Sequence, residues 1–175
     1  MDIKKARDED LIDVLYLLKQ EITTTCKTSE CPPNPDYSHL REEIRKGTIH
    51  ILEHHKISIG TFSVHQPHSG EEKNGDVKSG LNKNGEEKNG EHLRVDHLTI
   101  ASYWINNDTL QEMMRFLEET AKNRHVPVLR LMVNRHNKKM NTFLKNLGFD
   151  FVREESGQKD AMAFNVFEKK LMAAS

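Results

Sequence analysis

Two adjacent titratable residues, Asp96 and His97, lie in the apolar-patterned segment HLRVDHLTIAS and could transfer protons. A strand would direct their side chains to opposite faces of a sheet. Histidine has an unperturbed pKa of about 6.5, which suits a general base at neutral pH, whereas an aspartate needs burial to raise its pKa. The alternative is structural, with His97 packed against its neighbours and Asp96 paired with an arginine.

A second candidate is the segment SYWINNDTLQEMM, residues 102–114, where a strand pattern is followed by a helix pattern. Free amides at a helix N-terminus bind phosphates, often beside glycines that let the backbone approach closely. This junction contains no glycine, and the negative charge of Asp108 would repel a phosphate. The spacings Asp108-x-x-Gln111 and Thr109-x-x-Glu112 are typical of capping boxes, so an ordinary self-capped helix is the alternative.

The two cysteines, Cys26 and Cys31, lie in the segment CKTSEC, and His39 is the nearest histidine. Structural zinc sites need four ligands, usually cysteines and histidines at regular spacing, and the chain has no second cysteine pair. We therefore expect free thiols in a loop and no metal site.

Composition limits the class of protein. The 175 residues suffice for a single domain with a core, which we expect to span residues 1–175. A formal net charge of −1 does not favour nucleic-acid binding. No apolar run approaches the roughly 18 residues of a membrane span, and the N-terminal MDIKKARDED lacks the apolar stretch of a secretory signal. We expect a cytoplasmic protein that binds neither membranes nor nucleic acid.

Four tandem pentads, EEKNG DVKSG LNKNG EEKNG, occupy residues 71–90. Their only aliphatic residues are Val77 and Leu81, so the segment cannot bury enough apolar surface to offset the entropy of ordering it. We interpret residues 66–92 as a flexible, disordered low-complexity insertion between the third and fourth strands of the domain. It is either a neutral expansion of a surface loop or a tether to a partner.

The remaining segments alternate between strand and helix patterns. Apolar residues recur at helical spacing, for example at Met140, Phe143, Leu144 and Leu147. The order predicts an α/β protein with a mixed sheet and helices on both faces. The expected elements are a strand at residues 3–7, a helix from the cap Asp8 to about Ile22, a helix at 37–46 ended by Gly47, a hairpin at 48–64 that turns at 54–56, a strand at 92–102, a helix at 109–123, a strand at 126–134, a helix at 137–147 ended by Gly148, and strands at 149–155 and 161–171.

This order, β-α-α-β-β-β-α-β-α-β-β, resembles the GCN5-related N-acetyltransferase (GNAT) family over essentially the whole chain apart from the repeat. The most specific stretch is LRLMVNRHNKKMNTFLKNLGFDFV, which is similar to the family's fifth strand, Asn-initiated fourth helix and sixth strand. HLTIASYW resembles its fourth strand, and LQEMMRFLEETAK resembles its third helix. The resemblance implies a GNAT-like acyl-CoA N-acyltransferase fold, with acetyl-CoA as cosubstrate in a V-shaped opening between the fourth and fifth strands.

The resemblance also implies which residues contact the cosubstrate. In the family, backbone amides of the fourth strand hold the thioester, and a glycine-containing turn before the third helix holds the pyrophosphate. The turn here, INNDTL, has lost the family's Arg/Gln-x-x-Gly-x-Gly/Ala signature, and Leu144 stands where a tyrosine often protonates the leaving thiolate. The expected cofactor-binding residues are Leu98, Ile100, Ile105, Asn106, Asn107, Asp108, Thr109, Leu110 and Asn137.

The function that the resemblance implies is direct transfer of an acetyl group from acetyl-CoA to a primary amine of a small molecule or peptide, with His97 or Asp96 as the base. Glu21 and Tyr37 flank the loop that covers the acceptor in the family, so they are candidate substrate-binding residues. The alternative is a catalytically inactive GNAT-fold binding or interaction module, favoured by the changes in the turn and at Leu144. The pattern leaves open whether the protein forms a homodimer.

Overall fold

The computed structural model describes residues 1–25, 36–65, 92–156 and 163–171, with only the backbone described at residues 21–25. Cys26, Cys31 and the insertion therefore lie outside the described residues, except that His92 already begins a strand. The predicted order of elements is confirmed. The elements are β1 (Asp2–Lys5), α1 (Leu11–Thr25), α2 (Tyr37–Arg45), β2 (Ile49–His54), β3 (Ile57–His65), β4 (His92–Ile100), α3 (Asn107–Asn123), β5 (Val128–Asn134), α4 (Lys138–Asn146), β6 (Asp150–Ser156) and β7 (Ala163–Lys170), with 3-10 turns at η1 (Asp8–Asp10) and η2 (Ser102–Trp104).

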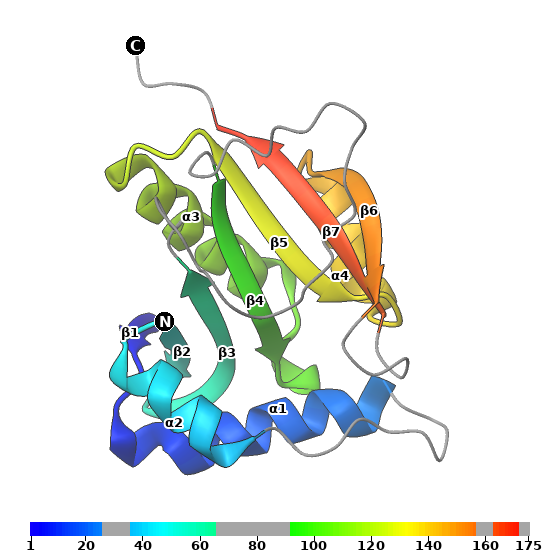
Figure 1. Ribbon diagram of the computed structural model, residues 1–175. Coiled ribbons are helices and arrows are strands. Elements are labelled where there is room, and N and C mark those ends of the chain that lie inside the picture. The colour runs from blue at the N-terminus through cyan, green and yellow to red at the C-terminus, as the bar shows by residue number, and fades with distance from the viewer. Residues whose placement is uncertain (26–35, 66–91, 157–162, 172–175) are drawn as a thin grey trace.

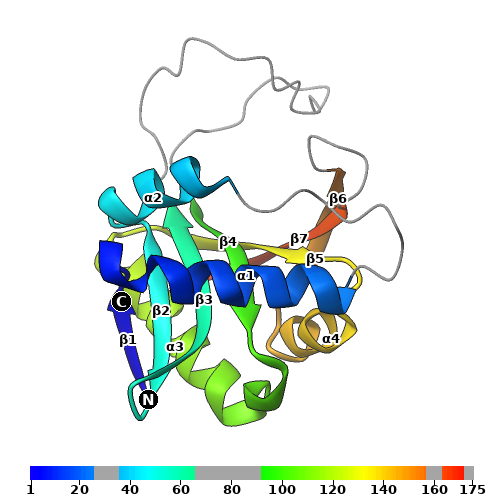
Figure 2. The ribbon, with the colours of Figure 1, turned by 90° about the horizontal axis from the view of Figure 1, so that it is seen from below.

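The strands form one mixed sheet in the order β1-β2-β3-β4-β5-β7-β6. Neighbouring strands run antiparallel except for β4 and β5, which are parallel. Helices α1 and α2 pack with β2 on one face, and α3 and α4 cover the other face (Figures 1 and 2). The predicted mixed sheet with helices on both faces is confirmed.

Helix α3 is held against the sheet by one apolar stripe. Its buried residues Leu110, Met113, Met114, Leu117 and Ala121 follow the spacing of a single helix face. Fully burying one leucine or methionine side chain contributes roughly 1.5–3 kcal/mol, so this stripe fixes the helix firmly. The N-terminus of α3 is thereby fixed just beyond η2, the short turn that follows β4.

The start of the first helix differs from the prediction, because Asp8 is not its cap. Residues Asp8–Asp10 form the 3-10 turn η1, and α1 begins at Leu11. The Asp10 carboxylate accepts a hydrogen bond from the Arg7 backbone N–H (2.8 Å) and pairs with Lys4 (3.2 Å). The acidic run therefore forms its own turn before the helix, and α1 then continues past the predicted end at Ile22 to Thr25.

Gly60 allows β3 to approach β4 closely. A Cβ atom at this position would lie 2.9 Å from the Thr99 carbonyl oxygen and 3.3 Å from the Ile100 side chain. The first of these atoms belongs to the backbone, so it cannot move aside without shifting the strand. Any side chain at residue 60 would displace the C-terminal half of β4.

We predict that Gly60→Ala lowers the free energy of unfolding by about 1–3 kcal/mol, the usual cost of overpacking a well-packed site. Chemical denaturation monitored by circular dichroism would measure this loss. Wild-type stability in Gly60→Ala would contradict the close approach of the two strands.

Candidate active site at the divergence of β4 and β5

The parallel pairing of β4 and β5 ends early. It runs from His92 opposite Val128 to Val95 opposite Leu131. Beyond this point β4 continues to Ile100 beside β3, while β5 continues to Asn134 beside β7. Figure 1 shows the two strands diverging towards α1. The sheet is therefore split along its middle over the second half of β4.

A β-bulge at His97 coincides with the divergence. The register between β3 and β4 changes from Ser63 opposite Asp96 to Thr61 opposite Thr99, so β4 carries one extra residue. His97 adopts a left-handed backbone with a φ of 53°. The expectation that Asp96 and His97 point to opposite faces is wrong, because the bulge interrupts the alternation that it assumed.

The burial pattern confirms this interruption. Val95 and Leu98 are both buried in the core beneath the sheet, although they are three residues apart. Asp96 is half-buried and His97 is exposed, so neither residue belongs to the core. The two candidate bases therefore lie together at the point where the strands separate.

Backbone amides of β4 face the opening. The Ala101 N–H donates to the Ile59 carbonyl on β3 at 2.8 Å. Because N–H groups alternate along a strand, those of Ile100 and Leu98 are directed to the other edge, towards β5. The side chains of Leu98 and Ile100 are buried, with 2% and 7% exposed. A ligand in the opening would contact these two residues through their backbone.

The turn before α3 is capped by Asn106. Its side-chain oxygen accepts from the Thr109 N–H at 2.9 Å, and its carbonyl accepts from the Leu110 N–H at 3.1 Å. A self-capped helix is confirmed, but the two predicted capping boxes that start at Asp108 and Thr109 are wrong. In the first turn, the amides of Asn107 and Asp108 have no acceptor within the helix, as is usual at a helix N-terminus.

Side chains around this turn differ in their exposure. Thr109 and Leu110 are buried, so Leu110 packs in the core and does not crowd the turn from outside. Asn107 and Asp108 are exposed, and Ile105 is half-buried against the core. The Asp108 carboxylate lies at the positive end of the helix dipole, where it stabilises the helix and opposes the binding of an anion.

The opposite wall of the opening is fixed by a chain of asparagines, of which the sequence analysis identified only Asn137. Asn137 caps α4 by accepting from the Met140 N–H at 3.1 Å. The Asn141 side chain donates to the carbonyls of Asn134 (3.1 Å) and Asn137 (2.7 Å), and Asn165 donates to Asn141 at 2.7 Å. These bonds tie the end of β5 to α4 and β7.

Leu144 contributes only to packing. Its side chain is fully buried in the core between α4 and the sheet. No polar group replaces the tyrosine that the family often has at this position. The apolar stripe of α4 therefore explains the residue completely.

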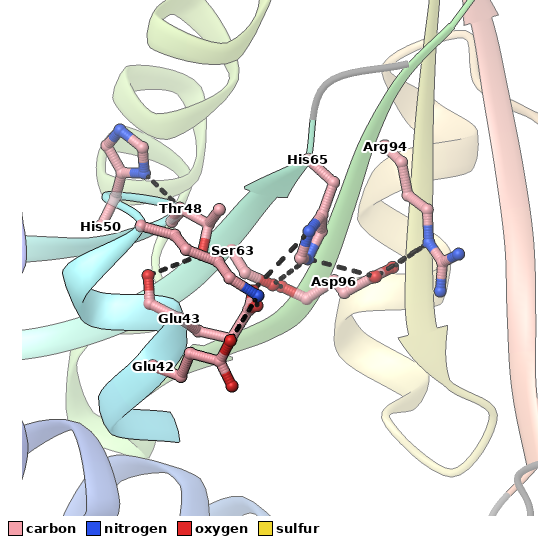
Figure 3. Close-up of polar contacts among 9 residues, drawn as sticks. Glu42, Glu43, Thr48, His50, Ser63, His65, Arg94 and Asp96 are labelled. Carbon is pink, nitrogen blue, oxygen red and sulfur yellow. Dashed lines mark hydrogen bonds and ion pairs between the residues drawn. The ribbon is translucent and has the colours of Figure 1, made fainter. Parts of the chain in front are cut away.

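A cluster of titratable side chains borders the bulge (Figure 3). His65, the last residue of β3, lies between Glu43 of α2 and Asp96 of β4, at 3.8 Å from the Glu43 carboxylate and 3.6 Å from the Asp96 carboxylate. Asp96 also pairs with Arg94 at 2.8 Å, as the structural alternative for this residue predicted. The sequence analysis missed Glu43 and His65, because only the fold brings their segments together.

The pKa values of His97 and Glu43 are both lowered. Desolvation lowers the pKa of His97, although the nearby Asp96 carboxylate opposes this effect. His97 keeps contact with solvent, and the direction of the shift favours its neutral form at pH 7. Burial tends to raise the pKa of Glu43, but the hydrogen bond from Thr48 and the nearby charges of His65 and Lys46 outweigh it and lower the pKa.

Ser63, His65 and Glu43 follow the order of groups in a Ser-His-acid triad. Ser63 Oγ lies 3.1 Å from His65 Nε2, but the hydroxyl also donates to the Asp96 carbonyl at 3.1 Å. Only 1% of Ser63 is exposed, so it cannot reach a substrate carbonyl in the opening. The arrangement does not provide a nucleophile.

The two predicted substrate-binding residues, Tyr37 and Glu21, lie on the helices α2 and α1 and not on β4 or the turn after it. Tyr37 is the first residue of α2, the helix that carries Glu43, and it is exposed. Glu21 lies in α1, and its side chain is outside the described residues. The structure thus brings together the predicted residues of β4 and the turn that follows it, and the roles of all these residues stay predictions.

Within the part of the chain that the structure describes, no group of three or more histidine, cysteine, aspartate or glutamate residues could hold a metal ion. None of the helices formed by the described residues is long and apolar enough to cross a membrane.

Solved structures share this architecture over almost the whole chain. The ribosomal-protein-alanine N-acetyltransferase from Brucella melitensis is 17% identical with a TM-score of 0.67, and the alignment covers 98% of this chain and 100% of that one. A GNAT-family acetyltransferase from Streptococcus agalactiae 2603 is 16% identical with a TM-score of 0.69, covering 98% and 95%. The chain has the GNAT fold. A GNAT-family acetyltransferase from Listeria monocytogenes 4b F2365 adds a further match at 17% identity, with a TM-score of 0.63 and coverage of 97% and 94%.

The resemblance to the GNAT family predicted from the sequence is confirmed at the level of the fold. No family model matches the sequence, and no curated protein does, so the likeness rests on structure. At identities of 16–17% a shared fold does not establish a shared activity. The function therefore has to be argued from the site of this GNAT-fold protein.

We predict that Asn106→Ala lowers the free energy of unfolding by about 1 kcal/mol, because the Thr109 amide loses its cap. Asn107→Ala is the matched control, since Asn107 lies one residue inside the helix and its side chain does not cap it. Urea denaturation of the two variants would measure the difference. Equal stability of both variants would mean that Asn106 is not the cap.

Proposed function

We propose that this GNAT-fold protein is an N-acetyltransferase that moves an acetyl group from acetyl-CoA to a primary amine of a small molecule or peptide. The observation that carries the proposal is the divergence of β4 from β5 beyond Val95, with a bulge at its apex. This divergence exposes strand-edge amides to a ligand, which a closed sheet would not do. The same fold in known acetyltransferases supports the assignment.

The residues present fit acetyl-CoA in most respects. The amides of Leu98 and Ile100 would hold the pantetheine arm and polarise the thioester carbonyl, as donors aimed at developing negative charge do in acyl transfer. The first-turn amides of Asn107 and Asp108 would hold the pyrophosphate. The carboxylate of Asp108 opposes this binding, so we expect affinity in the micromolar range and no tighter.

The chemistry needs a neutral amine. Its nitrogen attacks the thioester carbon, the new N–C bond forms as the C–S bond breaks, and the sulfur leaves with the bonding electrons. The amine proton passes to His97 or Asp96, the titratable residues at the bulge, and the lowered pKa of His97 keeps it able to accept a proton at pH 7.

Departure of the thiolate needs no acid from the protein. A thiol with a pKa of about 8.5 is expelled as the thiolate at pH 7 at a cost of only about 2 kcal/mol. Leu144 is buried and apolar, so the family's usual tyrosine has no substitute at this position. We propose that the thiolate takes its proton from water, at the cost of a slower reaction.

Calorimetric titration with acetyl-CoA, followed by an assay of CoA release, tests the proposed function. Three amines serve as acceptor probes: tyramine, spermidine and a peptide with a free N-terminus. We expect micromolar binding and acetylation of at least one probe. Micromolar binding without turnover of any probe would favour the inactive binding module, and no heat at millimolar acetyl-CoA would refute the assignment of the cofactor site.

We predict that Asp108→Asn tightens acetyl-CoA binding about fivefold, because it removes a carboxylate from the site of the pyrophosphate and so relieves about 1 kcal/mol of repulsion. Glu112→Gln is the matched control, one turn further along α3, where the native carboxylate is exposed and paired with Arg115 at 2.8 Å. We expect this control to bind like the wild type. Both dissociation constants are measured by calorimetry at low ionic strength, where screening is weak.

An unchanged dissociation constant in Asp108→Asn, with the wild type binding normally, would place the pyrophosphate elsewhere. A decrease in thermal stability alone would not locate the pyrophosphate. The Asp108 carboxylate interacts favourably with the helix dipole, so its removal lowers the free energy of unfolding by roughly 0.3–1 kcal/mol for that reason.

A further inference from the structure

Both ring nitrogens of His65 face groups that can accept a proton (Figure 3). Nδ1 lies 3.8 Å from Glu43 Oε2, and Nε2 lies 3.6 Å from Asp96 Oδ2 and 3.1 Å from Ser63 Oγ. The side chain is 32% exposed, so the ring also reaches solvent. These contacts join α2 to the residue that directly precedes the bulge at His97.

The Ser63 hydroxyl suits either protonation state of His65. It has two acceptors at 3.1 Å, the Asp96 carbonyl and His65 Nε2. When Nε2 is unprotonated, the hydroxyl can donate to it. When Nε2 is protonated, it donates to Ser63 Oγ, and the hydroxyl turns to the Asp96 carbonyl. His65 can therefore gain and lose a proton without any movement of heavy atoms.

The carboxylate oxygens that face His65 already have closer partners. Asp96 Oδ2 pairs with Arg94 Nε at 2.8 Å, and Arg94 approaches it from the side opposite His65 (Figure 3). Glu43 Oε2 accepts from Thr48 Oγ1 at 2.9 Å. A carboxylate oxygen can accept more than one hydrogen bond, so a charged imidazole would be a second donor to each. The Lys46 ammonium pairs more closely with Glu42 (3.0 Å) than with Glu43 (3.6 Å). The titratable and charged groups that face the ring or act on its partners are Glu43 and His39 from α2, Lys46 directly after α2, and Arg94, Asp96 and His97 from β4.

We propose that His65 is a proton-relay residue of the acetyl transfer, an inference that rests on the proposed function. The proton that leaves the acceptor amine at the bulge reaches Nε2 of His65, through the base at residue 96 or 97. The opposite ring nitrogen releases a proton beside Glu43 to solvent. The ring gains one proton at Nε2 and loses one from Nδ1, so His65 is neutral again at the end of each transfer.

A purely structural role is the competing explanation, in which His65 only ties α2 to β4. The distances of 3.6 and 3.8 Å are longer than direct hydrogen bonds, so neither carboxylate fixes the ring by one, and a proton would pass between the ring and each carboxylate through a bridging water. A tie would also not need a neighbouring hydroxyl with two acceptors. The two roles differ in the way that activity depends on pH.

The experiment compares wild type, His65→Gln and His125→Asn in the CoA-release assay, with acetyl-CoA and the probe amine of highest turnover, between pH 5.5 and pH 9. His125 is an exposed histidine just after α3, and asparagine tolerates its left-handed backbone (φ 58°), so it serves as the matched control. We expect kcat of His65→Gln to fall about 100-fold, the lower range for proton-transfer catalysis, with KM for acetyl-CoA unchanged.

The pH profile decides between relay and tie. The need for a neutral amine gives wild type and every variant an acidic limb, so the informative quantity is the ratio of their kcat values at each pH. If His65 relays the proton, the advantage of the wild type over His65→Gln shrinks as the pH falls, because a ring that is already protonated cannot accept another proton, whereas the ratio of wild type to the control stays constant. A structural tie would instead raise KM or lower the melting temperature and leave the ratio of wild type to His65→Gln independent of pH, which would overturn the proposal, as would wild-type kcat in His65→Gln.

A second variant keeps the proposal testable if His65→Gln does not fold. Ser63→Ala removes the hydroxyl but leaves the imidazole, and we expect a smaller fall in kcat with KM for acetyl-CoA unchanged. Unchanged kcat in Ser63→Ala would overturn the part of the proposal that rests on the hydroxyl. A wild type that neither binds acetyl-CoA nor acetylates any probe would refute the proposed function itself, and the relay with it.

Discussion

Backbone hydrogen bonding is the constraint on which the rest of the structure depends. Amide and carbonyl groups in the middle of a sheet normally pair with both neighbouring strands. Here β4 and β5 pair over only four residues each, and then each strand follows its outer neighbour alone. The polar edges that this separation creates can pair with a ligand, so the split in the sheet and the candidate site are the same feature.

The two walls of the opening are held in different ways. On the β4 side, Gly60 lets β3 approach closely, and the bulge at His97 turns β4 away from β5. On the β5 side, side-chain amides of Asn141 and Asn165 tie the strand to α4 and β7. Because each wall is held by its own partners, β4 and β5 stay separated without a bound ligand.

Much of the fold could be predicted from local patterns. The apolar stripes of α3 and α4, and Gly148 after α4, gave the correct elements, because helical spacing and a left-handed terminal residue are local properties. The hairpin turn at His55 and Lys56, both with positive φ, was also predictable from the alternating residues on either side. The order of these elements was then sufficient to indicate the fold.

The candidate site was less predictable, and the reasons differ from residue to residue. The bulge adds one residue to a strand whose pattern still resembles regular alternation, so the sequence does not reveal it. The cap of α3 could have been any residue of the run from Asn106 to Thr109, since each has a suitable side chain. The contact of His65 with Glu43 and Asp96 joins three distant segments, and only the register of the strands and the packing of α2 create it.

The left-handed backbone of His97 has a consequence for engineering this protein. Residue 97 adopts a φ of 53°, which glycine, asparagine and aspartate accept readily and β-branched residues do not. A mutant library at the apex of the opening would therefore recover few valine, isoleucine or threonine variants, whatever the selection favours. Substitutions on α2 would meet less restriction, because its regular helical backbone tolerates most side chains.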